Sequence, residues 1–184
     1  MLKEKFLVFV KSSFSEDKKN ELFAYIWKNY RKKISFYISN MIPARHPQFE
    51  DLFQEVMLKI CNSLHTFNPA HSFKAWIYTI SRNQCLDFLK SKAEKLKPYQ
   101  CASEDDMPDR NSPERIAIRN EIHEKIDQCI NSLNLMDREI AYLRFYENLK
   151  YREISKIVNL NMNSTKARIR LIKIKLRKDL RRVL

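Results

Sequence analysis

The chain has 184 residues, of which 44% are hydrophobic and 31% are charged, and its formal net charge is +13. This composition excludes a disordered or membrane-embedded chain, and the strong positive charge indicates a polyanionic partner. Because the sequence contains no glycine, the glycine-rich phosphate loops of P-loop and dinucleotide-binding folds are also excluded. No stretch approaches the length of a membrane span and there is no cleavable-signal pattern, so we expect a cytoplasmic protein without membrane insertion.

Helical patterns dominate the first half of the chain. Four helices are predicted, at about 3–11, at about 17–41, from 49 onward and at about 73–91. Pro43 and Pro47 end the second helix, because proline lacks the backbone N–H that a helix interior needs. Ser72 can cap the fourth helix by accepting a hydrogen bond from a free backbone N–H.

The second half begins after a polar, acidic and proline-interrupted stretch, 93–112, which is typical of a linker. A helix starting at Pro113 and running to about 132 is predicted next, followed by one over 135–147 that Asn134 can cap. We therefore predict an all-α protein with two small helical domains, 1–92 and 113–184, joined by a flexible acidic linker.

The end of the chain predicts a helix-turn-helix, with a short helix over 151–158, a turn at 159–161 and a long helix over 162–182. The long helix carries nine cations against one carboxylate, Asp179, while Ile169, Ile172 and Leu176 recur at three- and four-residue steps. One side of it is thus predicted to be buried and the other cationic, as in a helix that enters the major groove of DNA. Asn159 can adopt the left-handed backbone that the turn requires in a chain without glycine.

A catalytic or metal centre is not expected. The cysteines Cys61, Cys85, Cys101 and Cys129 lie far apart, and the four histidines add no metal-ligand spacing, so we interpret the cysteines as free or buried thiols. No cluster of nucleophile, base and metal ligand is evident, and we predict no enzyme activity, no metal, no cofactor and no small-molecule substrate.

Three segments follow one another along the chain, and they are residues 51–60, DLFQEVMLKI, residues 73–89, FKAWIYTISRNQCLDFL, and residues 137–155 with the basic helix. Together and in this order they resemble the extracytoplasmic-function group of bacterial RNA polymerase sigma factors. The first segment resembles the helix that binds core polymerase, the second resembles the promoter-melting helix, and the third resembles the second DNA-binding domain. The resemblance implies a sigma factor that binds core RNA polymerase, directs promoter-specific transcription initiation and helps to open the strands at the minus-ten element. It also implies control by an anti-sigma factor.

The resemblance implies a role for the polar side of the helix that begins near Phe49. On its residues alone, this side is an ordinary solvated helix face. The resemblance implies instead that it docks on the polymerase clamp through Asp51, Gln54, Glu55 and Leu58.

The resemblance assigns the minus-ten element to the fourth helix, through Lys74, Trp76, Tyr78, Arg82 and Asn83. Aromatic side chains interleaved with cations and an amide suit unpaired bases. Trp76 and Ile80 can instead be core residues, and for Trp76 we favour this supporting role over contact with DNA. We expect Arg82 and Asn83 on the other face. The loop 65–72 is implied to form a pocket for a flipped base.

The last helix is implied to read the minus-thirty-five element, through Asn161, Asn163, Ser164, Lys166, Ala167, Arg168 and Arg170. Asn161 is expected to cap this helix, and the side chains of the first turns can reach base edges. Leu171 stands where the family commonly has a basic residue, so the family's sequence preference cannot be assumed. An alternative function is a stand-alone helix-turn-helix regulator, which would bind its operator without polymerase.

Overall fold

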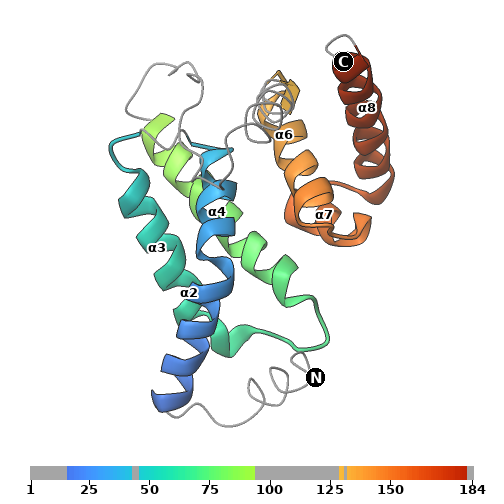
Figure 1. Cartoon of the computed structure of the whole chain (residues 1–184). Coiled ribbons are helices and arrows are strands. Elements are labelled where there is room, and N and C mark those ends of the chain that lie inside the picture. Colours follow the sequence, from blue (N-terminus) through green and yellow to red (C-terminus); the bar gives the residue numbers. More distant parts are fainter. Residues whose placement is uncertain (1–15, 43–45, 94–128, 131, 182–184) are drawn as a thin grey trace, which may run out of the picture. The chain divides into compact units, whose positions relative to one another are not determined.

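A computed structural model describes residues 16–42, 46–93, 129–130 and 132–181, and all regular structure within these ranges is helical (Figure 1). The chain divides into two compact units, 1–100 and 101–184. The all-α prediction with two helical units is thus confirmed. The predicted helix over 3–11, the linker 93–112 apart from Ala93, and nearly all of the helix predicted over 113–132 lie outside the described residues.

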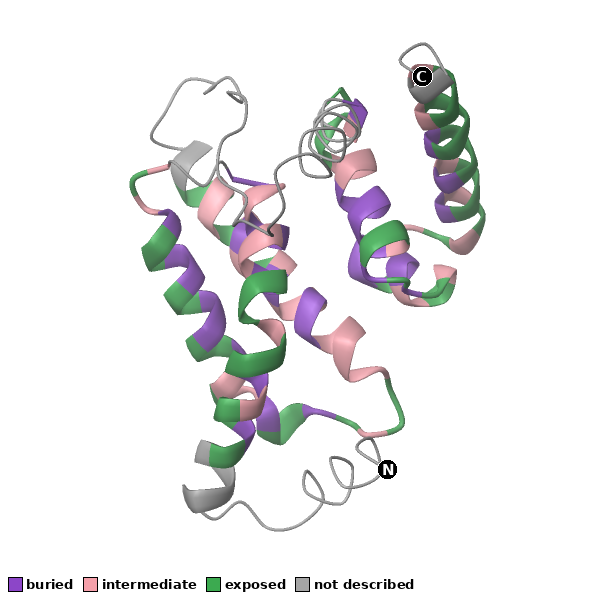
Figure 2. Cartoon of the chain, viewed as in Figure 1, coloured by how far each residue is buried: buried purple, intermediate pink, exposed green. Residues whose placement is uncertain are grey.

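The first unit is built on three long helices, α2 (Glu16–Ser39), α3 (Phe49–Asn62) and α4 (Phe73–Ala93). Helix α3 packs against α4, and α2 packs against both. Their shared core contains fully buried Ile34, Tyr37, Val56, Ile60 and Ile77. Figure 2 shows buried segments along these helices. A short 3₁₀ turn, η1 (Leu64–Thr66), follows α3. The backbone N–H of Ala75 donates to the Oγ of Ser72 at 3.2 Å, which confirms the predicted cap of α4.

The second unit contains α6 (Leu135–Ala141), the π-helical turn η2 (Tyr142–Tyr146), α7 (Tyr151–Ile157) and α8 (Met162–Arg181). Helix α6 packs against η2 and α8, and α7 packs against η2 and α8. The cap predicted for α6 is confirmed, because the backbone N–H of Asp137 donates to Oδ1 of Asn134 at 2.9 Å.

The predicted helix over 135–147 is not a continuous α-helix, because it widens into η2 after Ala141. The N–H of Glu147 donates to the carbonyl of Tyr142, five residues earlier, at 3.1 Å. In an α-helix, side chains five residues apart diverge, whereas a π turn aligns them. Tyr142 and Glu147 are both buried, and the hydroxyl of Tyr142 donates to Oε1 of Glu147 at 3.4 Å. The wider turn therefore allows the buried carboxylate of Glu147 to accept a hydrogen bond from the hydroxyl of Tyr142.

In the described part of this glycine-free chain, two asparagines supply left-handed backbone in turns. Asn159 has a φ of 54°, as predicted for the turn between α7 and α8, and Asn148 has a φ of 53° after η2. The backbone N–H of Ser164 donates to Oδ1 of Asn161 at 2.7 Å, so Asn161 caps α8 as expected. Asparagine thus stabilises the helix-turn-helix at two points, because Asn159 forms its turn and Asn161 caps the start of its second helix.

The cysteines that the structure describes are free thiols, as predicted. Cys85 and Cys129 are buried, and Cys61 is half-buried. Burial raises the pKa of the Cys61 thiol to about 11, and burial together with Asp179 raises the pKa of Cys129. Both therefore stay protonated and weakly nucleophilic near neutral pH.

Candidate nucleic-acid and partner interfaces

The residues predicted to bind polymerase lie together on one side of α3. Asp51, Gln54, Glu55 and Leu58 are all exposed, and Leu58 is 60% exposed. Their three- and four-residue spacing places them on one helix face, opposite the stripe that includes buried Leu52 and Val56. The first unit thus presents a surface in which two carboxylates and an amide lie along the helix on the N-terminal side of an exposed leucine. We call these four residues the α3 face.

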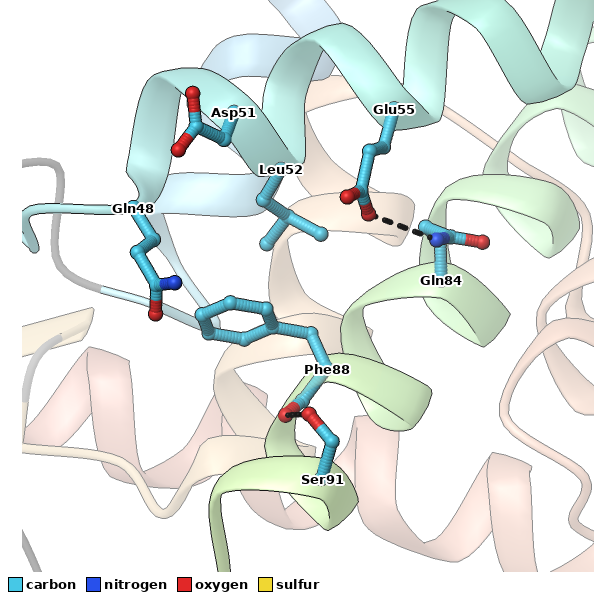
Figure 3. Close-up of a pocket in the computed structure, with 7 residues that line it drawn as sticks. All are labelled: Gln48, Asp51, Leu52, Glu55, Gln84, Phe88 and Ser91. Atoms are coloured by element: carbon cyan, nitrogen blue, oxygen red, sulfur yellow. Dashed lines mark hydrogen bonds between the residues drawn. The ribbon is translucent and has the colours of Figure 1, made fainter. Parts of the chain in front are cut away.

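A groove of about 290 Å³ borders the α3 face, between α3 and α4 (Figure 3). Asp51 and Glu55 lie on its α3 wall, and the Nε2 of Gln84 donates to Oε2 of Glu55 at 3.1 Å. Leu52 and Phe88 supply apolar surface between the walls. A groove with carboxylates at its edge and an apolar lining suits a cationic side chain with an aliphatic stem.

The α4 wall of this groove consists of Gln84, Phe88 and Ser91, which were not among the predicted site residues. Their four- and three-residue spacing is a detectable signal, because such residues share one face of a helix. The pattern was hidden because all of α4 was interpreted as a DNA-binding helix. In the structure, this side of α4 faces α3 instead.

The residues predicted to bind the minus-ten element do not all reach the surface. Asn83 is exposed, and Lys74, Trp76 and Arg82 are partly exposed. Tyr78 is fully buried and packs edge-on against Tyr37, with ring centroids 5.0 Å apart. The prediction that Tyr78 contacts DNA is therefore wrong, because its ring belongs to the core between α2 and α4.

Trp76 combines a packing role with partial exposure. Its ring stacks on Phe73 at 5.6 Å between centroids and lies 5.5 Å from Phe67, which belongs to the loop 65–72.

The prediction that Asn83 lies on a different face of α4 from Trp76 is also wrong. Residues seven apart on an α-helix differ by only about 20° in direction, so Asn83 and Trp76 lie on one face. An aromatic ring and an amide are thus aligned along α4, two turns apart.

Among the described residues of α8, Thr165, Ile169 and Ile172 form one buried stripe, which half-buried Leu176 extends, and much of the remaining helix surface is exposed (Figure 2). On one flank, α8 contacts the segment that precedes α6, because the Nζ of Lys175 donates to the carbonyl of Ser132 at 2.8 Å. Among the residues predicted to read the minus-thirty-five element, those outside this flank are exposed, namely Asn161, Asn163, Lys166, Ala167 and Arg170. Ser164 is partly exposed.

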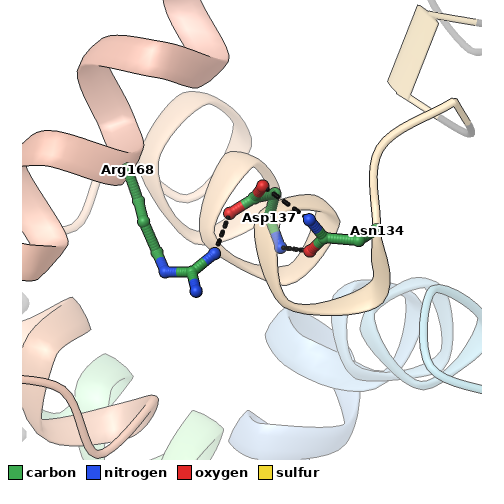
Figure 4. A network of polar contacts seen from close by, with 3 residues as sticks. All are labelled: Asn134, Asp137 and Arg168. Carbon is green, nitrogen blue, oxygen red and sulfur yellow. Dashed lines mark hydrogen bonds and ion pairs between the residues drawn. The ribbon is translucent and has the colours of Figure 1, made fainter.

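Arg168 differs from the rest of that set because it is turned toward α6 (Figure 4). Its Nη1 donates to Oδ1 of Asp137 at 2.8 Å, and the Nδ2 of Asn134 donates to the other carboxylate oxygen at 2.8 Å. The side chains of Arg168 and Asp137 are 38% and 21% exposed. The geometry therefore places Arg168 in a contact that joins α8 to the start of α6, and not on the exposed face of the helix.

We expect Arg168→Ala to lower stability by about 1 kcal/mol, because the ion pair is partly buried and charge-assisted yet screened by solvent. A double-mutant cycle with Asp137→Ala, followed by urea unfolding of the full chain, measures the coupling. Lys166→Ala, which removes an exposed cation two residues away, is the control and should show no coupling to Asp137. Additive losses for Arg168→Ala and Asp137→Ala would mean that the contact does not stabilise the protein.

A second groove, of about 410 Å³, runs along the opposite flank of α8 beside the start of α7. It is lined by Tyr151 of α7 and by Lys166, Ile169, Arg170, Lys173, Ile174 and Arg177 of α8. Cations thus recur at every turn along this flank over more than three turns. Such a row suits the regularly spaced phosphates of a duplex.

The part of the chain that the structure covers contains no group of three or more His, Cys, Asp or Glu residues able to hold a metal ion. None of the described helices is long and apolar enough to cross a membrane.

Comparison with known proteins identifies both units. Residues 26–95 match the family Sigma-70 region 2, and residues 123–176 match the family Sigma-70, region 4. The ECF RNA polymerase sigma factor SigX of Bacillus subtilis (strain 168) is 23% identical over 150 residues, covering 79% of this chain and 77% of SigX. The RNA polymerase sigma factor SigV of the same organism is 29% identical over 136 residues, covering 70% and 76% of the two chains.

Solved structures share the fold. The sigma factor RpoE, in complex with the anti-sigma factor NepR from Bartonella quintana, aligns with a TM-score of 0.65 and 16% identity, over 86% of this chain and 96% of that chain. CnrH, in complex with the cytosolic domain of CnrY, aligns with a TM-score of 0.60 and 16% identity, over 97% of both chains.

The two family matches fall in the order that the three sequence segments predicted. The match of residues 26–95 to region 2 does not favour a stand-alone helix-turn-helix regulator. The chain belongs to the extracytoplasmic-function sigma factors, the proteins that direct bacterial RNA polymerase to promoters.

Proposed function

We propose that the chain binds core RNA polymerase through the α3 face and holds promoter DNA at two places, on α4 and on α8. This proposal is supported mainly by the opposite charges of the surfaces on α3 and α8. Exposed carboxylates gather on the α3 face, and exposed cations gather on one flank of α8. The α3 face thus offers acidic groups to a protein partner, while α8 offers basic groups to DNA. In this proposal, 1–92 recognises and melts the minus-ten element, 93–112 is a flexible linker and 113–184 recognises the minus-thirty-five element.

Docking on the polymerase depends on Asp51, Gln54, Glu55 and Leu58. The exposed leucine supplies apolar contact, and the carboxylates set the register and rate of encounter with a basic partner surface. Gln84 and Phe88 extend this contact along the groove, where they can receive a lysine or arginine from the polymerase.

In this proposal, the sigma factor acts in the cytoplasm, performs no catalysis of its own and requires no cofactor. An anti-sigma factor is a further expected partner.

Strand opening depends on Trp76, Arg82 and Asn83. Stacking of a base on an aromatic ring contributes roughly 1–3 kcal/mol, which is similar to the cost of taking that base out of the duplex. Such a surface can therefore hold melted DNA without nucleotide hydrolysis. In this proposal, Lys74, which follows Phe73 at the start of α4, contacts backbone phosphate.

The test is reconstitution of the full chain with purified core polymerase and transcription from a library of genomic fragments. The expected result is a set of transcripts that requires both components and that starts downstream of related sequences. The proposal fails if the chain does not bind core polymerase, or if it binds a palindromic site tightly and specifically without it.

Asn83→Ala is expected to impair promoter opening by about tenfold while leaving closed-complex binding within about twofold, because the amide contacts only unpaired bases. Permanganate footprinting reports opening, and gel shift of the holoenzyme reports binding. Asn62→Ala, which removes an exposed amide at the end of α3, is the matched control. Equal losses in both measurements would remove Asn83 from strand separation.

A further inference from the structure

Helix α8 has a second apolar strip on the side that faces away from its own core. Ala167, Leu171 and Ile174 follow one another at steps of four and three residues, and Leu171 and Ile174 are 65% and 55% exposed. With 100° between successive residues, this strip lies about 160° around the helix from the buried stripe that contains Ile169 and Ile172. These apolar side chains are therefore not the edge of the core.

The charges beside the strip indicate which kind of partner binds there. Lys166, Arg170, Lys173 and Arg177 run along one side of it, and Lys178 is exposed beside its end. A second copy of the chain, with a net charge of +13, would bring like charges together at this border. A polyanion fits the border, and a duplex is a polyanion that also presents an apolar group in its major groove, the C5-methyl of thymine.

We propose that Leu171, together with Ala167 and Ile174, recognises thymine in the upstream promoter element by contact with its C5-methyl group. This inference rests on the proposed function of α8. Lys173 and Arg177 hold phosphates at the rim of the groove, while the aliphatic strip faces the base edges. From Ala167 to Ile174 the helix rises about 10 Å, which corresponds to about three base pairs. The upstream element therefore contains thymine within a stretch of about three base pairs.

Replacing thymine by deoxyuridine tests this directly, because it removes the methyl group and leaves every hydrogen-bonding atom in place. The probe is a promoter duplex recovered by transcription with the reconstituted holoenzyme, with each upstream thymine replaced in turn. Holoenzyme with the unaltered chain is expected to lose about fourfold in affinity at the contacted position, the value for one methyl group leaving water. Leu171→Ala holoenzyme should bind thymine and uracil probes equally well.

Leu135→Ala is the matched control, because Leu135 is an exposed leucine at the start of α6, outside α8. It should keep the preference for thymine. The inference is overturned if no replacement alters binding, or if Leu171→Ala keeps the full preference for the methyl group. It is also overturned if Leu171→Ala leaves DNA affinity unchanged but abolishes a dimer seen by sedimentation. Failure to obtain any holoenzyme transcript would instead refute the proposed function.

Discussion

Reversing the charge of the α3 face, in the double variant Asp51→Lys and Glu55→Arg, is expected to weaken core-polymerase binding about a hundredfold. Both carboxylates are exposed and border the same groove, so the reversal places two cations where a basic partner surface docks. Like charges brought together in an interface cost several kcal/mol, and about 3 kcal/mol corresponds to the expected loss. A competition assay between labelled unaltered chain and the variant for core polymerase measures the effect.

The control for this variant is Glu50→Lys, which changes charge on the same helix but at the edge of the α3 face, about 90° around from its centre. It should weaken binding by less than about threefold, as expected for a charge at the rim. Thermal unfolding of each variant should stay close to that of the unaltered chain, because exposed substitutions usually change stability by less than about 0.5 kcal/mol. Equal affinities for all of these variants would show that polymerase docks elsewhere.

Arg170→Ala is expected to lower holoenzyme affinity for the upstream element by about tenfold or more and to relax its sequence preference at one position. Arg170 is exposed in the groove beside Tyr151, in the third turn of α8. A bidentate arginine–guanine contact contributes about 1–3 kcal/mol of discrimination. Binding to a series of promoter variants, each changed at one base pair, measures both the affinity and the preference.

Arg177→Ala provides the comparison, since it removes a cation from the far end of the same row. A contact to phosphate carries no sequence information, so its loss should weaken binding to all variants equally and reduce the salt dependence. The two variants together separate base recognition from charge. If Arg170→Ala also weakens every variant equally, Arg170 contacts phosphate and the base-reading residues lie elsewhere.

The helices were predictable because each has a local signal. Helix α3 begins at Phe49 as expected, Ser72 and Asn134 cap the helices that follow them, and Asn159 adopts the predicted left-handed backbone. These features depend on residues close in sequence, within about one helical turn of each other.

The failures depend on contacts between distant residues. Tyr78 resembles a base-stacking residue by type, but its position on α4 turns it toward Tyr37 of α2. Arg168 resembles a base-reading residue by position, but Asp137, thirty-one residues earlier in the chain, holds its guanidinium. The π turn after Ala141 likewise depends on a buried contact between Tyr142 and Glu147. Periodicity shows which residues share a face, but it does not reveal what that face contacts.

Specific DNA recognition by this chain is expected to require core polymerase, and one binding experiment measures this requirement. A single promoter fragment is titrated with the full chain alone and with the reconstituted holoenzyme, at the same salt concentration and with competitor DNA. We expect specific binding by the holoenzyme and only weak, non-specific binding by the chain alone. Tight binding of the same fragment by the chain alone, unaffected by core polymerase, would contradict it.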